Sequence, residues 1–300
     1  MGLLDFQKQF SDEKSCVDYL IRMKWPEKVL CAGCGHEKLD FIRSKRAFEC
    51  RACRKQTYLT AGTIFDKSRL ALRKWFWAIF LMATSKKGVS MLYLQKQLGI
   101  KSYRAAWLMG QKIRQAMTQR DAIYSLKDTV EADEIYIGGQ QSFDKRREYG
   151  TNKTPFLIMV EENKESRPRF VSFEELESIY DEHLIPALKK KVEKGTSLKT
   201  DGGGGYVNAS ENGYYRHDRS VYMKDAKKTQ EHLRWINTIT GNLKRFLIST
   251  YHGVSHKYRR AYLAEFAYRF NRRYWPHQSF DRLLYACLNS KPVRPPALTS

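Results

Sequence analysis

The stretch TVEADEIYIGG, residues 129–139, decides the fold of the second half of the chain. Its β-branched and aromatic residues predict a strand, and the Gly-Gly pair at its end predicts a turn. Asp133 lies near the middle of this strand. An ionised carboxylate in such a run is costly to bury unless a cation or a metal compensates it. Asp133 is therefore the first candidate site residue.

Strand-like and helix-like segments alternate around this stretch, which favours an α/β domain over residues 129–285. Residues 155–162 and 167–173 are expected to be strands, and residues 173–194 a helix. A further short strand ends at Asp201, directly before a run of glycines. An aspartate in that position is open to a phosphate or a metal ion.

A later helix, expected to start near Gln230, supplies the third candidate ligand. Asn237 and Lys244 are seven residues apart, which is two helical turns, so they share one face. With Asp133 and Asp201, Asn237 would hold two hard divalent ions, Mg²⁺ or Mn²⁺, and Lys244 would bind a phosphate. Spacing alone leaves structural roles open: a salt bridge for Asp133, a turn cap for Asp201 and a helix N-cap for Asn237.

Two cysteine pairs indicate a metal site near the N-terminus. Cys31 and Cys34 lie in CAGC, Cys50 and Cys53 lie in CRAC, and fifteen residues separate the pairs. Four thiolates at this spacing are typical of a zinc ribbon, expected over residues 29–62, in which Zn²⁺ is structural. The alternative is four buried free thiols.

Residues 63–120 have the pattern of successive helices, with Ser90 and Ser102 as N-caps of the last two. Two short helices around a turn are typical of a helix-turn-helix DNA-binding segment. The alternative is a plain helical bundle. The last helix carries four side chains suited to reading bases: Arg104, Gln111, Lys112 and Arg114.

Composition restricts the partner more than the fold. The 300 residues include 54 Lys and Arg against 32 Asp and Glu, a formal charge of +22, which attracts polyanions. No apolar run approaches the roughly 20 residues that a membrane span needs, and residues 1–28 predict a helical lead and no secretory signal. The cysteine pattern favours a reducing, cytoplasmic compartment, and residues 286–300 are expected to form a tail.

Further basic residues are candidates for phosphate contacts. They lie in the loop 144–153, in the helix after Lys244 and in the run HKYRR (256–260), and a solvated charged face is the alternative. The candidates are Lys145, Arg146, Arg147, Arg245, Lys257, Arg259 and Arg260.

These motifs together resemble a known family. VEADEIYIGG, TDGGGGY, the two cysteine knuckles and the stretch HLRWINTITGNLKRF resemble bacterial insertion-sequence transposases that join a zinc ribbon to an ISXO-like domain of the DDE superfamily. The resemblance implies a ribonuclease-H-like fold with a mixed sheet and flanking helices. It implies that Asp133, Asp201 and Asn237 are the three metal ligands and that Lys244 is the family lysine. Asn237 stands where the wider superfamily usually has glutamate.

The resemblance also implies an activity and partners. The protein would bind the terminal inverted repeats of its own element and carry out metal-dependent DNA cleavage and strand transfer. Its partners would be the double-stranded DNA of the element ends and of the target, and a second copy of the chain at synapsis, in the bacterial cytoplasm at the nucleoid. Three alternatives remain open: a DNA-binding regulator with an inactive fold, a ribonuclease-H-like nuclease or resolvase, and an RNA-binding zinc protein.

Overall fold

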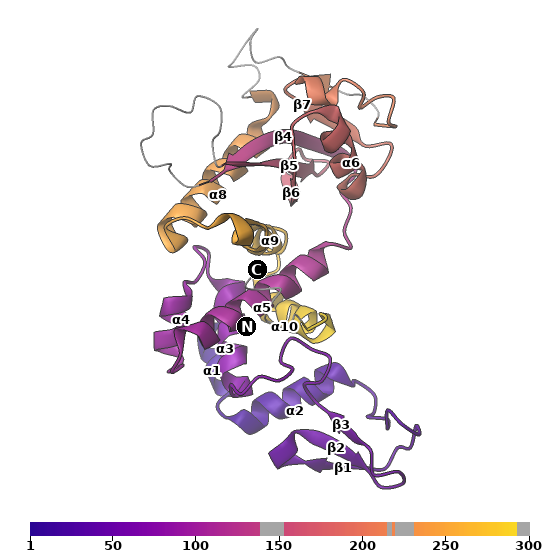
Figure 1. The fold of residues 1–300 in the computed structure, drawn as a ribbon, viewed down its shortest axis with the longest axis vertical. Helices are drawn as coiled ribbons and strands as arrows, with labels where there is room; N and C mark the ends of the chain where they lie inside the picture. The colour runs from indigo at the N-terminus through magenta and orange to yellow at the C-terminus, as the bar shows by residue number, and fades with distance from the viewer. Residues whose placement is uncertain (139–152, 215–217, 220–230, 293–300) are drawn as a thin grey trace. The chain divides into compact units, whose positions relative to one another are not determined.

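The structure, a computed structural model, describes residues 1–138, 153–214, 218–219 and 231–292. These residues divide into two units, each with its own internal contacts (Figure 1). One unit comprises Met1–Arg120 together with the described residues from Trp275 onward, and the other comprises Asp121–Tyr274.

The second unit is built on a mixed five-stranded sheet with the strand order β6-β5-β4-β7-β8. The pairs β4–β5 and β5–β6 are antiparallel, whereas β4–β7 and β7–β8 are parallel. This sheet with its flanking helices is an α/β arrangement, as the sequence predicts. The strands are β4 (Thr129–Ile137), β5 (Thr154–Glu162), β6 (Pro168–Glu175), β7 (Ser197–Thr200) and β8 (Asp218–Arg219).

Helices cover both faces of this sheet (Figure 1). Because side chains alternate along a strand, Val130 and Ala132 of β4 pack on one side, in the apolar cluster that contains Leu188. Ile135 faces the other cluster, which contains Leu243 and Phe266. The helices concerned are α6 (Asp181–Lys191) on the first side, and α8 (Arg234–Tyr251) and α9 (Arg259–Phe270) on the second.

The helix expected over residues 173–194 is shorter than predicted. Phe173 pairs with Ile158, so β6 continues through Glu175, and α6 begins only at Asp181. The glutamates of β6 favour a helix by propensity, but each has a cation partner in the folded sheet. Glu174 binds the Nζ atom of Lys190 at 2.6 Å, and Glu175 pairs with Arg260.

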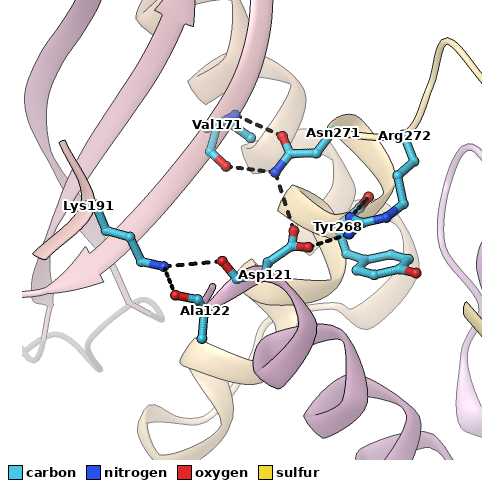
Figure 2. Close-up of polar contacts among 7 residues, drawn as sticks. All are labelled: Asp121, Ala122, Val171, Lys191, Tyr268, Asn271 and Arg272. Carbon is cyan, nitrogen blue, oxygen red and sulfur yellow. Dashed lines mark hydrogen bonds and ion pairs between the residues drawn. The ribbon is translucent and has the colours of Figure 1, made fainter. Parts of the chain in front are cut away.

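A polar cluster holds the first residue of the second unit in place (Figure 2). The Asp121 carboxylate accepts a hydrogen bond of 2.6 Å from Arg272, whose guanidinium lies 3.5 Å from the ring centroid of Tyr268. Asn271 accepts from the Val171 amide at 2.8 Å and donates to the Val171 carbonyl at 3.1 Å, so it continues the hydrogen bonding of β6. Lys191 donates to the carbonyl oxygen of Asp121, which stabilises a helix C-terminus.

The first unit contains a small antiparallel sheet and a set of helices. Ser90 caps its helix as predicted, since its hydroxyl accepts from the Tyr93 amide at 3.2 Å, and Gly99 adopts a φ of +55° after that helix. The elements are α1 (Leu3–Gln9), α2 (Glu13–Lys24), β1 (Leu39–Ile42), β2 (Ala47–Cys50), β3 (Gln56–Tyr58), α3 (Leu72–Thr84), α4 (Met91–Gln97), α5 (Tyr103–Asp121) and α10 (Ser279–Asn289). Across the described residues, no helix combines the length and apolar composition needed to cross a membrane.

Helix α10 joins the N-terminal unit although it lies near the other end of the sequence. Phe280 is 1% exposed, and its ring centroid lies 5.1 Å from that of Phe6, 5.3 Å from that of Phe10 and 5.6 Å from that of Phe76. The sequence pattern predicts one domain over residues 129–285, whereas α10 packs with the first unit. The reason is an aromatic cluster whose other members precede residue 85, a pairing that local patterns do not reveal.

We expect Phe280→Ala to lower the free energy of unfolding by about 3–5 kcal/mol, because it empties the centre of this aromatic cluster. Tyr285→Ala, in the same helix but with a side chain that is 49% exposed, should change that energy by less than about 0.5 kcal/mol. Chemical denaturation of both variants checks the prediction. Equal effects would show that α10 does not anchor the first unit.

Candidate functional site

The pairing of β4 with β7 brings Asp133 and Asp201 to one edge of the sheet. In this parallel pair Glu131 lies opposite Lys199. Asp133 and Asp201 each follow two residues later on their own strand, so they lie at the same level beyond the paired stretch. The two aspartates are thus neighbours in space although 67 residues separate them in the sequence.

The electrostatics of Asp133 confirm this proximity. Burial, followed by the negative charges of Glu134 and Asp201, raises the pKa of the half-buried Asp133 carboxyl to about 7. Its Oδ1 atom accepts from the Glu134 amide at 2.9 Å, and no Lys or Arg of the described chain is paired with it. Within the described residues, no salt bridge accounts for Asp133, and no cation of that part of the chain offsets its negative charge.

Asp201 begins a tight glycine turn. Its Oδ1 atom accepts from the Gly203 amide at 2.8 Å, so it does cap a turn. Gly202 has a φ of +79°, which favours glycine. A Cβ atom on Gly205 would lie 2.4 Å from the carbonyl oxygen of Ile179, which excludes a larger residue there. The glycines thus permit the backbone conformation of this turn, and one carboxylate oxygen of Asp201 stabilises the turn.

Asn237 lies in the first turn of α8 with an exposed side chain. The N-cap position of this helix is occupied by Leu233, so the N-cap alternative for Asn237 is wrong. Lys244 and Arg245 follow two turns later and are also exposed, and Arg245 donates to the Asn242 side chain at 2.7 Å. The structure therefore places Asn237 and Lys244 on the solvent-facing side of a helix that packs on the face of the sheet to which Asp133 points.

Sequence reasoning gave Glu131 no definite role. Glu131 is 1% exposed, and its Oε2 atom accepts from the amides of Trp235 and Ile236, both at 2.9 Å. Burial first, and then the neighbouring Glu162, raises the pKa of its carboxyl to about 8, although the Ile236 amide and Lys199 lower it. Lys199 binds Glu162 at 2.8 Å. The signal for it in the sequence is its spacing: Glu131 and Asp133 are two residues apart, so they lie on the same face of one strand.

The four cysteines form the predicted metal site in the first unit. Sγ–Sγ distances are 3.5 Å for Cys31–Cys53, 3.6 Å for Cys34–Cys50 and 3.5 Å for Cys34–Cys53. A tetrahedral zinc–thiolate site requires separations of roughly 3.8 Å, so the four sulfurs fit Zn²⁺. Backbone amides of Cys34 and Gly33 lower the pKa of the Cys31 thiol to about 6, which favours the thiolate. Within the described residues, no other group of three or more Cys, His, Asp or Glu gathers its ligand atoms within 4.8 Å.

Several residues predicted to contact DNA are buried instead. Gln111 is 2% exposed and Arg114 is fully buried, so the prediction that they read base edges is wrong in this conformation. Lys112 donates to the carbonyl oxygens of Ile64 and Asp66, and burial lowers its pKa.

The remaining basic candidates divide into buried, exposed and undescribed residues. Arg259 is 5% exposed and donates to the Thr154 hydroxyl at 2.6 Å, so its predicted phosphate contact is also wrong. Arg104, Lys257 and Arg260 are exposed, although Arg260 is paired with Glu175. Three candidates lie outside the described residues: Lys145, Arg146 and Arg147.

Comparison with known families decides how to interpret these two sites. Residues 125–271, which contain Asp133, Asp201 and Asn237, match the ISXO2-like transposase domain. The chain belongs to the ISXO2-like transposases. Residues 11–56, which contain all four clustered cysteines, match the transposase zinc-ribbon domain. Zinc in the ribbon is thus supported both by the family and by the sulfur geometry of this transposase-family chain.

A curated relative points the same way. A segment of 133 residues is 28% identical to a protein of Halobacterium salinarum described as an uncharacterized protein in transposable element ISH50. The match covers 43% of this chain and 44% of that relative. The chain therefore spans less than half the length of the relative, and the likeness supports the transposase family without assigning an activity.

We expect Cys53→Ser to lower the zinc content of the purified transposase-family protein well below one ion per chain, because three thiolates hold Zn²⁺ less tightly than four. Cys16→Ala is the matched control, since Cys16 is buried in α2 and outside the cluster. Elemental analysis after dialysis against a chelator measures the difference. Full zinc retention in Cys53→Ser would contradict a four-cysteine site.

Proposed function

We propose that this protein is an active transposase that cleaves the DNA ends of an insertion sequence and joins them to a target. The observation that carries the proposal is the position of Asp133 and Asp201 on adjacent parallel strands of an ISXO2-like domain. Two carboxylates at one sheet edge, with no Lys or Arg partner in the part of the chain that the structure describes, suit metal-assisted chemistry on a phosphodiester.

The sheet supports a ribonuclease-H-like fold for this domain. Three antiparallel strands in the order β6-β5-β4 are followed by the parallel strands β7 and β8, with α6 on one face and α8 and α9 on the other. This order places Asp133 on the central strand β4 and Asp201 directly after its parallel neighbour β7. The mixed sheet with flanking helices is of the kind that the family resemblance implies.

Mg²⁺ or Mn²⁺ fits the donor set of this edge. Carboxylate and amide oxygens are the ligands that hard divalent ions prefer. Burial and the negative charges of Glu134 and Asp201 raise the pKa of Asp133, and bound divalent ions would offset both effects. We assign Asp133, Asp201 and Asn237 as the ligands. When bound, the ions would lower the pKa of an attacking water or 3′-hydroxyl and stabilise the leaving oxygen.

The remaining residues of the site would orient DNA. Lys244 is exposed two turns beyond Asn237, where its ammonium group would hold a phosphate beside the cleaved bond. In the first unit, α4 and α5 would form the helix-turn-helix that recognises the inverted repeats. Its exposed residues Tyr93, Tyr103 and Arg104 replace the buried Gln111 and Arg114 as candidates for base and backbone contacts.

We expect Asp133→Asn and Asp201→Asn each to abolish cleavage of a DNA duplex carrying the element end in the presence of Mg²⁺. Each change removes one negative ligand, while the DNA-binding residues of the first unit are untouched. Cleavage is read on a denaturing gel, and binding of the same duplex by electrophoretic mobility shift should persist.

Glu177→Gln is the control for these variants. Its side chain is 88% exposed in the same unit, so loss of its charge should leave cleavage unchanged. If either aspartate variant cleaved DNA at the wild-type rate, the proposed active site would be refuted. A wild-type protein that binds element ends without ever cutting them would instead favour the regulator alternative.

The exposed side of α8 offers a path for a DNA strand. Gly241 lies between Asn237 and Lys244 on this side, and a Cβ atom there would meet nothing within 4 Å. Glycine inside a helix is unfavourable by about 0.8–1.0 kcal/mol relative to alanine, so its presence needs a reason. At Gly110 of α5 the reason is internal, since a Cβ would lie 2.0 Å from the Met91 sulfur. At Gly241 we infer that the reason is the close approach of the DNA backbone.

We expect Gly241→Ala to raise the free energy of unfolding by up to about 1 kcal/mol and yet to weaken cleavage, because the methyl group occupies space needed by DNA. Thermal unfolding and the cleavage assay measure the two effects separately. Ser249→Ala, eight residues away on the exposed part of the same helix, should leave cleavage unchanged. A Gly241→Ala protein that is more stable and fully active would refute this DNA path.

A further inference from the structure

We propose that Glu131 is a positioning residue, which holds the helix carrying Asn237 against the strand carrying Asp133. This inference rests on the proposed function, because it concerns the ligands assigned there. In this role the buried Glu131 side chain would affect the metal site through the position of Asn237.

The first argument is that Glu131 supplies the N-terminal cap that α8 lacks. The residue at the cap position is Leu233, whose side chain cannot accept a hydrogen bond. An ordinary cap satisfies the amides of the second and third helical residues. These residues are Trp235 and Ile236, and both amides donate to Oε2 of Glu131 at 2.9 Å. A carboxylate from a neighbouring strand thus replaces the local cap and also suits the positive end of the helix dipole.

The second argument is the position of the metal ligands relative to this contact. Asn237 directly follows the second of the two capped amides, and Asp133 lies two residues beyond Glu131 on the same face of β4. One side chain therefore links the backbone next to Asn237 with the backbone next to Asp133. Loss of the contact would let the first turn of α8 move relative to the strand, and the third ligand would move with it.

The surroundings of Glu131 argue against a direct ligand role. Glu131 is 1% exposed and lies beside Glu162, which in turn binds Lys199 at 2.8 Å. Trp235 provides a second attachment for the same helical turn, because its indole Nε1 donates to the carbonyl oxygen of Ser166 at 2.8 Å. Glu131 is thus engaged on several sides, whereas the exposed Asn237 side chain remains accessible to solvent.

The test compares Glu131→Ala with Glu131→Gln in the full-length protein. Glutamine keeps an oxygen that accepts from both amides but loses the charge, whereas alanine loses the cap. We expect Glu131→Ala to weaken Mn²⁺ binding about 10-fold or more, the usual effect of removing an outer-shell partner, and Glu131→Gln to keep it close to wild type. Mn²⁺ binding without DNA is measured by electron paramagnetic resonance, and the Mg²⁺ concentration for half-maximal cleavage gives a second readout.

Glu161→Ala is the matched control for stability. Glu161 is also 1% exposed and accepts from a backbone amide, that of Lys127 at 3.0 Å, but it alternates with Leu157 and Met159 on the α6 face of β5. Its loss should destabilise the protein without changing the Mn²⁺ affinity. An unchanged Mn²⁺ affinity in Glu131→Ala, or equal losses in Glu131→Ala and Glu161→Ala, would overturn the positioning role.

Two further variants separate the alternatives. If Glu131→Ala does not fold, Glu131→Asp replaces it, because aspartate keeps the charge but is one methylene shorter and cannot reach both amides. A positioning role predicts that glutamine binds Mn²⁺ better than aspartate, whereas a direct ligand role predicts the reverse and would refute the inference. Asp133→Asn tests the proposed function independently. If Asp133→Asn is inactive while Glu131→Ala binds Mn²⁺ as tightly as the wild type, only the positioning role is refuted.

Discussion

The candidate site of the second unit depends on the register between β4 and β7. Parallel pairing with Glu131 opposite Lys199 fixes where each strand ends, and so sets Asp133 beside Asp201. A shift of one residue would turn one of these carboxylates to the other face of the sheet. The apolar residues Val130, Ala132 and Leu198 oppose such a shift, because they are fully buried on the α6 side. Core packing therefore also determines the site.

This arrangement costs stability when no cation is present. A carboxyl whose pKa is raised by folding stabilises the folded state below its usual pKa, and that contribution is lost as the pH rises through the folded value. For Asp133 the window extends from about 4 to about 7. At neutral pH the folded unit thus holds a partly ionised carboxylate that burial and like charges disfavour. A site that is electrostatically unfavourable on its own is the kind that binds cations, and functional sites are where such shifts concentrate.

Much of the site could be predicted from the sequence because its signals are local. The cysteine spacing, the aspartate within a β-prone run and the aspartate before glycines each depend on a few consecutive residues. The orientation of α5 could not be predicted, because its polar positions Gln111 and Arg114 are buried by tertiary packing that helical periodicity does not contain. The same holds for Arg259, which is buried against Thr154, and for α10, whose aromatic partners lie some 200 residues earlier. Sequence patterns therefore did not predict burial that depends on contacts between residues far apart in the chain.

The electrostatic setting also bears on the proposed ligand at position 237, whose side chain is an amide. Asp133 already experiences the negative charges of Glu134 and Asp201, and Glu131 and Glu162 lie buried further along the sheet. A third carboxylate at position 237 would add repulsion in the metal-free protein and raise the pKa of Asp133 further. An amide keeps an oxygen donor without that penalty, at the expense of weaker attraction for the cation. Precise placement of the proposed neutral ligand then matters more. Leu233 cannot cap the helix that carries it, and a buried glutamate on the strand of Asp133, Glu131, accepts from the helix amides instead.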